Sequence, residues 1–217
     1  MREHLLPSSQ SLGISLSNVV SARAELDDMQ LIAASKKGDQ DAFAQLVQRY
    51  QRRVFNLVYR MLQHYEEANE ITQETFLAAW QGLPAFRGDA RFPTWLYRIA
   101  YNCSLKSLEQ RKRDKALQEA LQAEQVLERA YGDKSADAQL EMHDRQAFIQ
   151  ELIARLPTKY RVVLILRHLQ DMTYEEMAEI LTMPIGTIKT HLFRARNLLK
   201  ERLQTLDRDR FLGTRGS

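Results

Sequence analysis

The chain has 217 residues, of which 44% are hydrophobic and 27% charged, and its net charge at pH 7 is +3. These values are typical of a soluble globular protein and exclude disordered and fibrous classes. Only eight Gly and five Pro favour helices over a many-turned β fold. The single cysteine, Cys103, excludes an intramolecular disulfide and a multi-cysteine zinc site. Because Cys103 follows an apolar run, we expect a buried thiol.

Targeting signals are not evident in the sequence. No apolar stretch approaches the roughly 20 residues that a membrane-spanning helix needs. Arg2 is not followed by a continuous apolar segment, as it would be in a secretory signal. We therefore expect no membrane insertion and a cytoplasmic location.

Charge is distributed unevenly along the chain. Cations outnumber carboxylates over residues 87–115, carboxylates dominate over residues 117–151, and cations return over residues 189–202. This order is typical of two modules that face nucleic acid, separated by an acidic spacer.

The first half reads as a series of helices. After an N-terminal extension at residues 1–26, a helix is expected to end at Gly38 and a longer one to run from about Gln40 to Leu62. A third is expected from Glu66 to Leu83, and its apolar positions are Ala68, Ile71, Phe76, Leu77 and Trp80. A loop around Pro84 follows, and Pro93 is placed to begin a fourth helix that reaches the basic run at residues 111–113.

The second half predicts an acidic linker at residues 114–144, a small helical domain at residues 145–206 and a polar tail at residues 207–217. The domain's first helix ends before Pro157. The apolar run at residues 162–166 fits strand or helix, and its flanks favour helix. The whole chain is therefore predicted to be all-α, with two small helical domains, at residues 27–113 and 145–206, joined by a linker.

Residues 173–200 predict a helix-turn-helix. Thr173 and Glu176 have the spacing of a capping box, Pro184 and Gly186 break the chain, and Thr187 could cap the second helix. On that second helix Ile188, Leu192, Ala195 and Leu199 share one face, and Lys189, Thr190, Phe193 and Arg194 share the other. Cations beside an exposed ring suit a helix in the DNA major groove. An ordinary helical hairpin remains the alternative.

Aromatic and basic residues alternate over residues 86–106. Rings that stack on unpaired bases and cations that track phosphates are typical of single-strand binding. Trp95 and Phe92 could equally be core residues of a helical bundle. Tyr97 and Tyr101 are expected to be more accessible than those two.

Residues 66–76 form an acidic helix with no neighbouring His or Cys. Catalysis by paired carboxylates and a metal site are therefore not expected there. A Gln among carboxylates and apolar residues favours a docking surface for a basic protein, and a merely solvated face is the alternative.

These motifs together resemble a protein family. QETFLAAW at 73–80, FRGDARF at 86–92, WLYRIAYN at 95–102, LPTKYRVVLILR at 156–167 and IGTIKTHLFRAR at 185–196 occur in the order found in alternative bacterial sigma factors of the extracytoplasmic-function type, within the sigma-70 family. The resemblance covers about residues 27–206.

The resemblance implies a sigma factor that binds core RNA polymerase and directs initiation at promoters. By similarity, the first domain binds the polymerase β′ clamp and recognises and melts the −10 element, and the second reads the −35 element near the β flap. The implied polymerase-binding residues are Glu70, Gln73, Glu74, Phe76 and Trp80. Those for the −10 element and melted strand are Phe86, Arg87, Gly88, Asp89, Arg91, Phe92, Trp95, Tyr97, Arg98, Tyr101, Asn102 and Lys106. Those for the −35 duplex are Thr187, Lys189, Thr190, His191, Phe193 and Arg194.

Some residues depart from the family pattern. His191 stands where Arg is usual and Thr190 where Ser is usual, which implies a shifted −35 preference. Asn69 replaces a common acidic residue, and Tyr101 replaces a small or basic one. The resemblance also implies an anti-sigma partner, no cofactor and no catalytic activity. A stand-alone helix-turn-helix regulator is the alternative function, and a nucleic-acid enzyme is less favoured because the five His show no ligand spacing.

Overall fold

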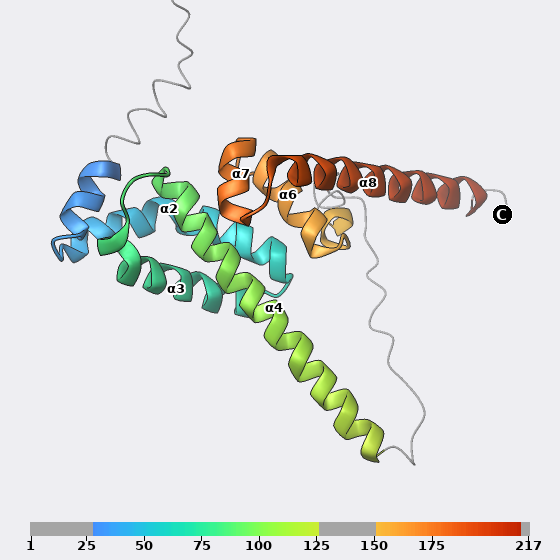
Figure 1. The fold of residues 1–217 in the computed structure, drawn as a ribbon. Coiled ribbons are helices and arrows are strands. Elements are labelled where there is room, and N and C mark those ends of the chain that lie inside the picture. Colours follow the sequence, from blue (N-terminus) through green and yellow to red (C-terminus); the bar gives the residue numbers. More distant parts are fainter. Residues whose placement is uncertain (1–27, 126–150, 214–217) are drawn as a thin grey trace, which may run out of the picture. The chain divides into compact units, whose positions relative to one another are not determined.

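The computed structural model describes residues 28–125 and 151–213, and side chains at 28–119 and 151–205. The N-terminal extension, most of the predicted acidic linker and the end of the tail lie outside these residues. Within the described residues the chain contains helices and turns and no strand, which confirms the all-α prediction (Figure 1).

The first described half contains three long helices. A helical segment at residues 28–35 precedes α2 (Gln40–Leu62), α3 (Tyr65–Gly82), a short 3₁₀ turn η1 (Leu83–Ala85) and α4 (Phe92–Gln125). The helix predicted to stop near residue 113 thus continues to Gln125, into the segment predicted as linker, because the residues after Arg113 are good helix formers.

The second described half contains the helix-turn-helix. Helical residues 151–154 precede α6 (Thr158–His168), α7 (Tyr174–Leu181) and α8 (Ile185–Gly213). The apolar run at residues 162–166 is helical, as its flanks favoured, and every residue in it is buried. α8 extends past the expected domain end at residue 206.

Two compact units, residues 1–47 and 48–217, divide within α2. In the first unit, Gly38 takes a φ of 93°, a conformation that glycine adopts readily, and so ends the segment that precedes α2. Asp39 then caps α2, because its Oδ1 accepts the backbone N–H of Ala42 at 2.9 Å.

In the second unit, α3 packs along α4, and α6 packs on α7 and α8 (Figure 1). Thr72 and Thr75 are buried on α3 and satisfy their hydroxyls on backbone carbonyls one turn earlier, at 2.6 and 2.7 Å. An ion pair between Arg111 and Glu67, at 3.0 Å, also joins α4 to α3. The core of the second unit includes Leu57, Met61, Ala68, Leu83, Leu96, Ala100, Leu156, Ile165, Met177, Ile180, Ile188 and Leu192.

Candidate nucleic-acid and polymerase interfaces

The loop before α4 is anchored by aromatic rings. Phe86 and Phe92 are buried, and Trp95 is half-buried. The ring centroids of Phe86 and Trp95 are 4.9 Å apart, and Phe92 lies 5.8 Å from Trp95 and 5.5 Å from Tyr50. Such contacts fix the two ends of a loop whose middle has no core residues.

The middle of the loop faces solvent. Arg87, Gly88 and Asp89 are exposed, and Gly88 takes a φ of 83°. The left-handed turn at Gly88 lets the chain reverse without a side-chain clash. Arg91 is exposed, and its Nη1 lies 3.1 Å from the carboxylate of Glu176. The loop thus exposes cations to solvent, while aromatic rings anchor its two ends.

On α4, the polar candidates lie on one exposed face. Arg98, Asn102 and Lys106 are all exposed and occur at intervals of four residues, which places them one above another along the helix. Lys106 lies 4.0 Å from Glu74 of α3. This face offers donors and positive charge over a little more than two turns.

Tyr97 and Tyr101 differ from the expectation of accessible rings. Their exposed fractions are 1% and 8%, so they are less accessible than the half-buried Trp95, and the expectation is wrong. The Tyr97 hydroxyl donates to Oε1 of Gln170 at 2.9 Å. Burial raises the pKa of Tyr97 to about 12 and also raises the pKa of Tyr101. Both phenols are therefore core groups in this structure.

Cys103 also differs from the expectation, because it is half-buried. Desolvation by burial, and then the nearby Glu74 carboxylate, raise the pKa of its thiol. A raised pKa keeps the thiol protonated near neutral pH and therefore weakly nucleophilic.

The polymerase-binding candidates on α3 divide into exposed and covered residues. Glu70, Gln73 and Glu74 are exposed, Trp80 is half-buried and Phe76 is buried. Leu77, one of the apolar positions of this helix, is 58% exposed. Residues 70, 73, 74 and 77 share one helical face, so Leu77 adds an apolar group to the acidic surface. The i, i+3, i+4, i+7 spacing could have revealed it.

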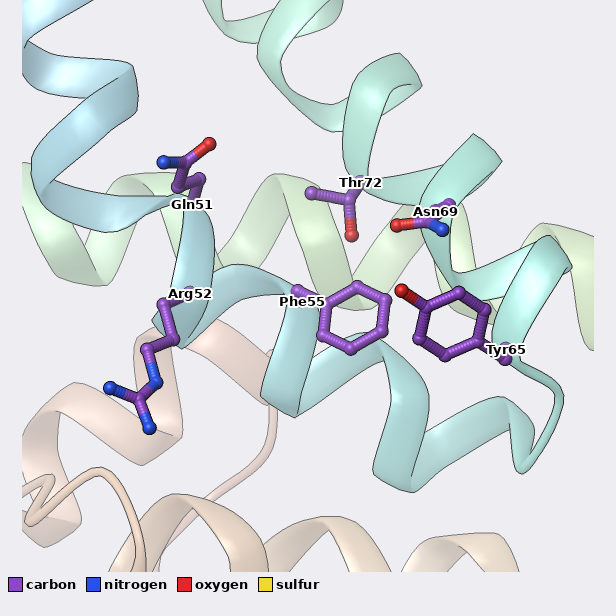
Figure 2. Close-up of a pocket in the computed structure, with 6 residues that line it drawn as sticks. All are labelled: Gln51, Arg52, Phe55, Tyr65, Asn69 and Thr72. Carbon is purple, nitrogen blue, oxygen red and sulfur yellow. The ribbon is translucent and has the colours of Figure 1, made fainter.

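A cavity of about 280 Å³ lies between α2 and α3 (Figure 2). Its lining residues are Gln51, Arg52, Phe55, Tyr65, Asn69 and Thr72. Figure 2 shows the rings of Phe55 and Tyr65 next to each other and Arg52 pointing away from them. The Phe55 ring contacts Tyr65 edge to face at 5.4 Å and stacks on Tyr59 at 5.8 Å. No sequence motif indicated this aromatic group.

The helix-turn-helix begins with the predicted capping box. The Thr173 hydroxyl accepts the backbone N–H of Glu176 at 3.2 Å, and Glu176 accepts the backbone N–H of Thr173 at 2.8 Å. Thr182 ends α7 with a φ of 53°. The second helix starts two residues before the expected cap, because the Pro184 carbonyl accepts the backbone N–H groups of Thr187 and Ile188. Thr187 therefore lies inside α8 and is not its cap.

α8 presents two faces. Ile188, Leu192 and Ala195 are buried, as expected, and Leu199 is half-buried. On the outward face Lys189, Thr190 and Arg194 are exposed, and Phe193 is 64% exposed. Thr187 and His191 are half-buried. The structure thus brings the predicted duplex-reading residues together on one side of α8.

The start of α6 adjoins this face. The ring of Tyr160 lies 5.4 Å from the imidazole of His191, with the two planes at 88°. The Lys159 ammonium lies 5.1 Å from the centroid of the same phenol ring. Desolvation by burial, and then the charges of Lys159 and Arg194, lower the pKa of His191, which favours the neutral imidazole.

Metal-binding clusters and membrane-spanning helices are both absent from the described residues. No group of three or more His, Cys, Asp or Glu in these residues could hold a metal ion. None of the described helices is both long and apolar enough to cross a bilayer.

Known families match both described halves. Residues 46–114 match the family model for sigma-70 region 2, and residues 149–199 match that for sigma-70 region 4. The ECF RNA polymerase sigma factor SigW of Bacillus subtilis is 36% identical over 178 residues, which cover 79% of this chain and 94% of the relative. The RNA polymerase sigma-H factor of Pseudomonas aeruginosa is 34% identical and covers 84% of this chain and 96% of its own length.

Solved structures share the fold. CnrH in complex with the cytosolic domain of CnrY has a TM-score of 0.59 and 24% identity, and covers 82% of this chain and 98% of its own. The sigma factor RpoE of Bartonella quintana, solved with the anti-sigma factor NepR, has a TM-score of 0.57 and 25% identity, and covers 75% and 96%. The all-helical fold, the matches to sigma-70 regions 2 and 4, and the relatives that align over nearly their full length all indicate the same family. The chain belongs to the extracytoplasmic-function sigma factors, which direct promoter-specific initiation of transcription by bacterial RNA polymerase.

Proposed function

We propose that the chain acts as a sigma factor through three exposed surfaces. One binds RNA polymerase, one binds the melted DNA strand and one reads duplex DNA. The outward face of α8 gives the strongest support for this proposal. Lys189, Thr190 and Arg194 project from a helix whose opposite face is buried, and Phe193 is exposed beside them. Arg and Lys bind guanine edges and phosphates in the major groove, and a ring can contact a thymine methyl. This face would read the −35 element as duplex.

The loop at residues 87–91 and the polar face of α4 would bind the −10 strand. The Arg98, Asn102 and Lys106 row offers charge and hydrogen bonds to successive phosphates or bases. Phe86, Phe92 and Trp95 would hold the loop in shape, and the half-buried Trp95 is the ring nearest to solvent. Tyr97 would reach a base only after its hydrogen bond to Gln170 is released.

The α3 face would bind core RNA polymerase. Glu70, Gln73 and Glu74 supply negative charge and Leu77 supplies apolar area, a combination that suits a basic helical partner such as the β′ clamp. Phe76 and Trp80 would act mainly by holding α3 on its neighbours. The β flap would meet the C-terminal domain.

The proposal includes a regulator and a location. The RpoE structure from Bartonella quintana contains an anti-sigma factor, which supports a similar protein partner for this chain. We further propose that the protein acts in the bacterial cytoplasm, has no catalytic activity of its own and requires no cofactor. The match to region 2 disfavours a stand-alone helix-turn-helix regulator, because duplex binding alone does not require that region.

Reconstitution with core RNA polymerase tests the proposal. The full chain should co-elute with core and support run-off transcription from a subset of genomic promoter fragments. Arg194→Ala should lose preference among −35 sequences, whereas Arg196→Ala, on the same helix and placed beside His168 at 3.4 Å, should keep it. Absence of both co-elution and promoter-dependent transcripts would refute the proposed function.

A further inference from the structure

Tyr160 contacts one of the residues proposed to read duplex DNA, although it lies on a different helix. It is the third residue of α6, half-buried, and meets His191 edge to face at 5.4 Å. The Arg194 guanidinium is the main cause that lowers the pKa of Tyr160, because a nearby positive charge favours the phenolate. Tyr160 thus contacts an imidazole of the outward face of α8.

Packing, and not hydrogen bonding, holds the imidazole. Nδ1 of His191 is buried and has no hydrogen-bond partner among the described residues. Its position therefore depends on the rings and chain around it, and the perpendicular Tyr160 ring is an aromatic contact of the preferred geometry. Removal of that ring would leave the imidazole with more than one rotamer.

Lys159 contributes positive charge at the same place. Its ammonium lies 5.1 Å from the Tyr160 ring centroid, within the range of a cation–π contact. A phenol flanked by two cations stabilises both without adding a negative charge that would repel DNA phosphates. A carboxylate at position 160 would hold the cations too, but it would oppose binding.

We propose that Tyr160 is a positioning residue for −35 recognition: its ring fixes the His191 imidazole on the face of α8 that meets duplex DNA. The inference rests on the proposed function of α8. Because Tyr160 acts through a base-reading residue, it contributes to the choice of sequence and less to affinity for DNA in general. That difference separates it from a simple phosphate contact.

The test uses holoenzyme assembled from the full chain and core polymerase, with a plasmid library in which the −35 element is randomised. Sequencing of the transcribed templates gives the preference at each base pair. Profiles of Arg194→Ala and His191→Ala assign base pairs to each residue. Tyr160→Ala removes the ring, so preference at the base pairs assigned to His191 should fall by about tenfold. Tyr160→Phe keeps the ring and should retain that preference.

Tyr59→Phe, at a 40% exposed phenol on α2, is the matched control and should keep the wild-type profile. Thermal melting should show that Tyr160→Ala is folded at the assay temperature, so that the change is not one of folding. An unchanged Tyr160→Ala profile, or an equal loss on all templates, would overturn the inference alone. A wild-type holoenzyme without any −35 preference would overturn the proposed function and this inference together.

Discussion

Thr173 and Glu176 satisfy each other's backbone N–H groups at the first turn of α7. The helix has only eight residues, so the N–H groups at its start are a large share of its hydrogen-bonding groups. We expect Thr173→Ala to lower the free energy of unfolding by about 1 kcal/mol, measured by urea denaturation and circular dichroism. Thr173→Ser, which keeps the hydroxyl, should retain most of the stability. Equal losses in both variants would show that the methyl group matters and the cap does not.

Local patterns made this part of the fold predictable. The capping box and the two faces of α8 depend on residues within two turns of each other, and both are as the spacing indicated. The start of α8 was less predictable. A proline is a chain breaker in a sequence pattern, yet the Pro184 carbonyl begins the hydrogen-bonded ladder of α8.

Exposure was harder to predict, because it depends on distant parts of the chain. Tyr97 is buried and bonded to a residue 73 positions later, a relationship that no local window contains. Leu77 is the reverse case, since an apolar residue at helical spacing is usually core and here lies in solvent. The contact of Tyr160 with His191 was equally unpredictable, since the two residues are more than 30 positions apart in sequence.

Leu77 gives a prediction about polymerase binding. If the acidic face of α3 binds core RNA polymerase, Leu77→Asp would place a charge where apolar area is buried, and affinity for core should fall roughly tenfold or more. Fluorescence anisotropy of the labelled protein with core polymerase measures this. Leu117→Asp is the matched control, because Leu117 is 61% exposed on α4. Equal losses of affinity in both variants would contradict a specific role of the α3 face.

Gly82 and Gly186 give opposite predictions for the same substitution. A Cβ at Gly82 would lie 3.3 Å from Cζ2 of Trp95, whereas one at Gly186 would have nothing within 4 Å. Both glycines are helical, so alanine gains about 1 kcal/mol of helix propensity at each. At Gly82 we expect displacement of the indole to offset that gain, because overpacking costs about 1–3 kcal/mol. Gly186→Ala should be the more stable variant.

The position of Trp95 can be followed directly. In a Trp80→Phe background Trp95 is the only tryptophan of the chain, which has two. Gly82→Ala should shift its emission spectrum, since the ring must move against Phe86 and Phe92. Gly186→Ala should leave the spectrum unchanged. Identical spectra for both variants would mean that Gly82 does not hold Trp95 in place.

Tyr97 links stability to alkaline pH. Burial raises its pKa in the folded protein to about 12, from an ordinary value of 10.0. Between these values the unfolded chain releases the phenolic proton and the folded chain retains it, so stability is complete below pH 10 and falls as the pH rises toward 12. The difference between these two pKa values corresponds to about 2–3 kcal/mol of unfolding free energy. Tyr97→Phe has no phenolic proton to release, so ionisation at this position should not lower its stability between pH 10 and pH 12.

The order of stability of the wild type and Tyr97→Phe should therefore reverse as the pH rises. Near pH 7, Tyr97→Phe should be less stable than the wild type by about 1 kcal/mol, because it lacks the hydrogen bond to Gln170 and leaves the Gln170 oxygen without that donor. Above about pH 11 the wild type has lost more than that amount, and the variant should be the more stable protein. Urea denaturation over a pH series measures both free energies. A difference that stays constant from pH 7 to pH 11 would show that the Tyr97 phenol is as accessible in the folded chain as in the unfolded one.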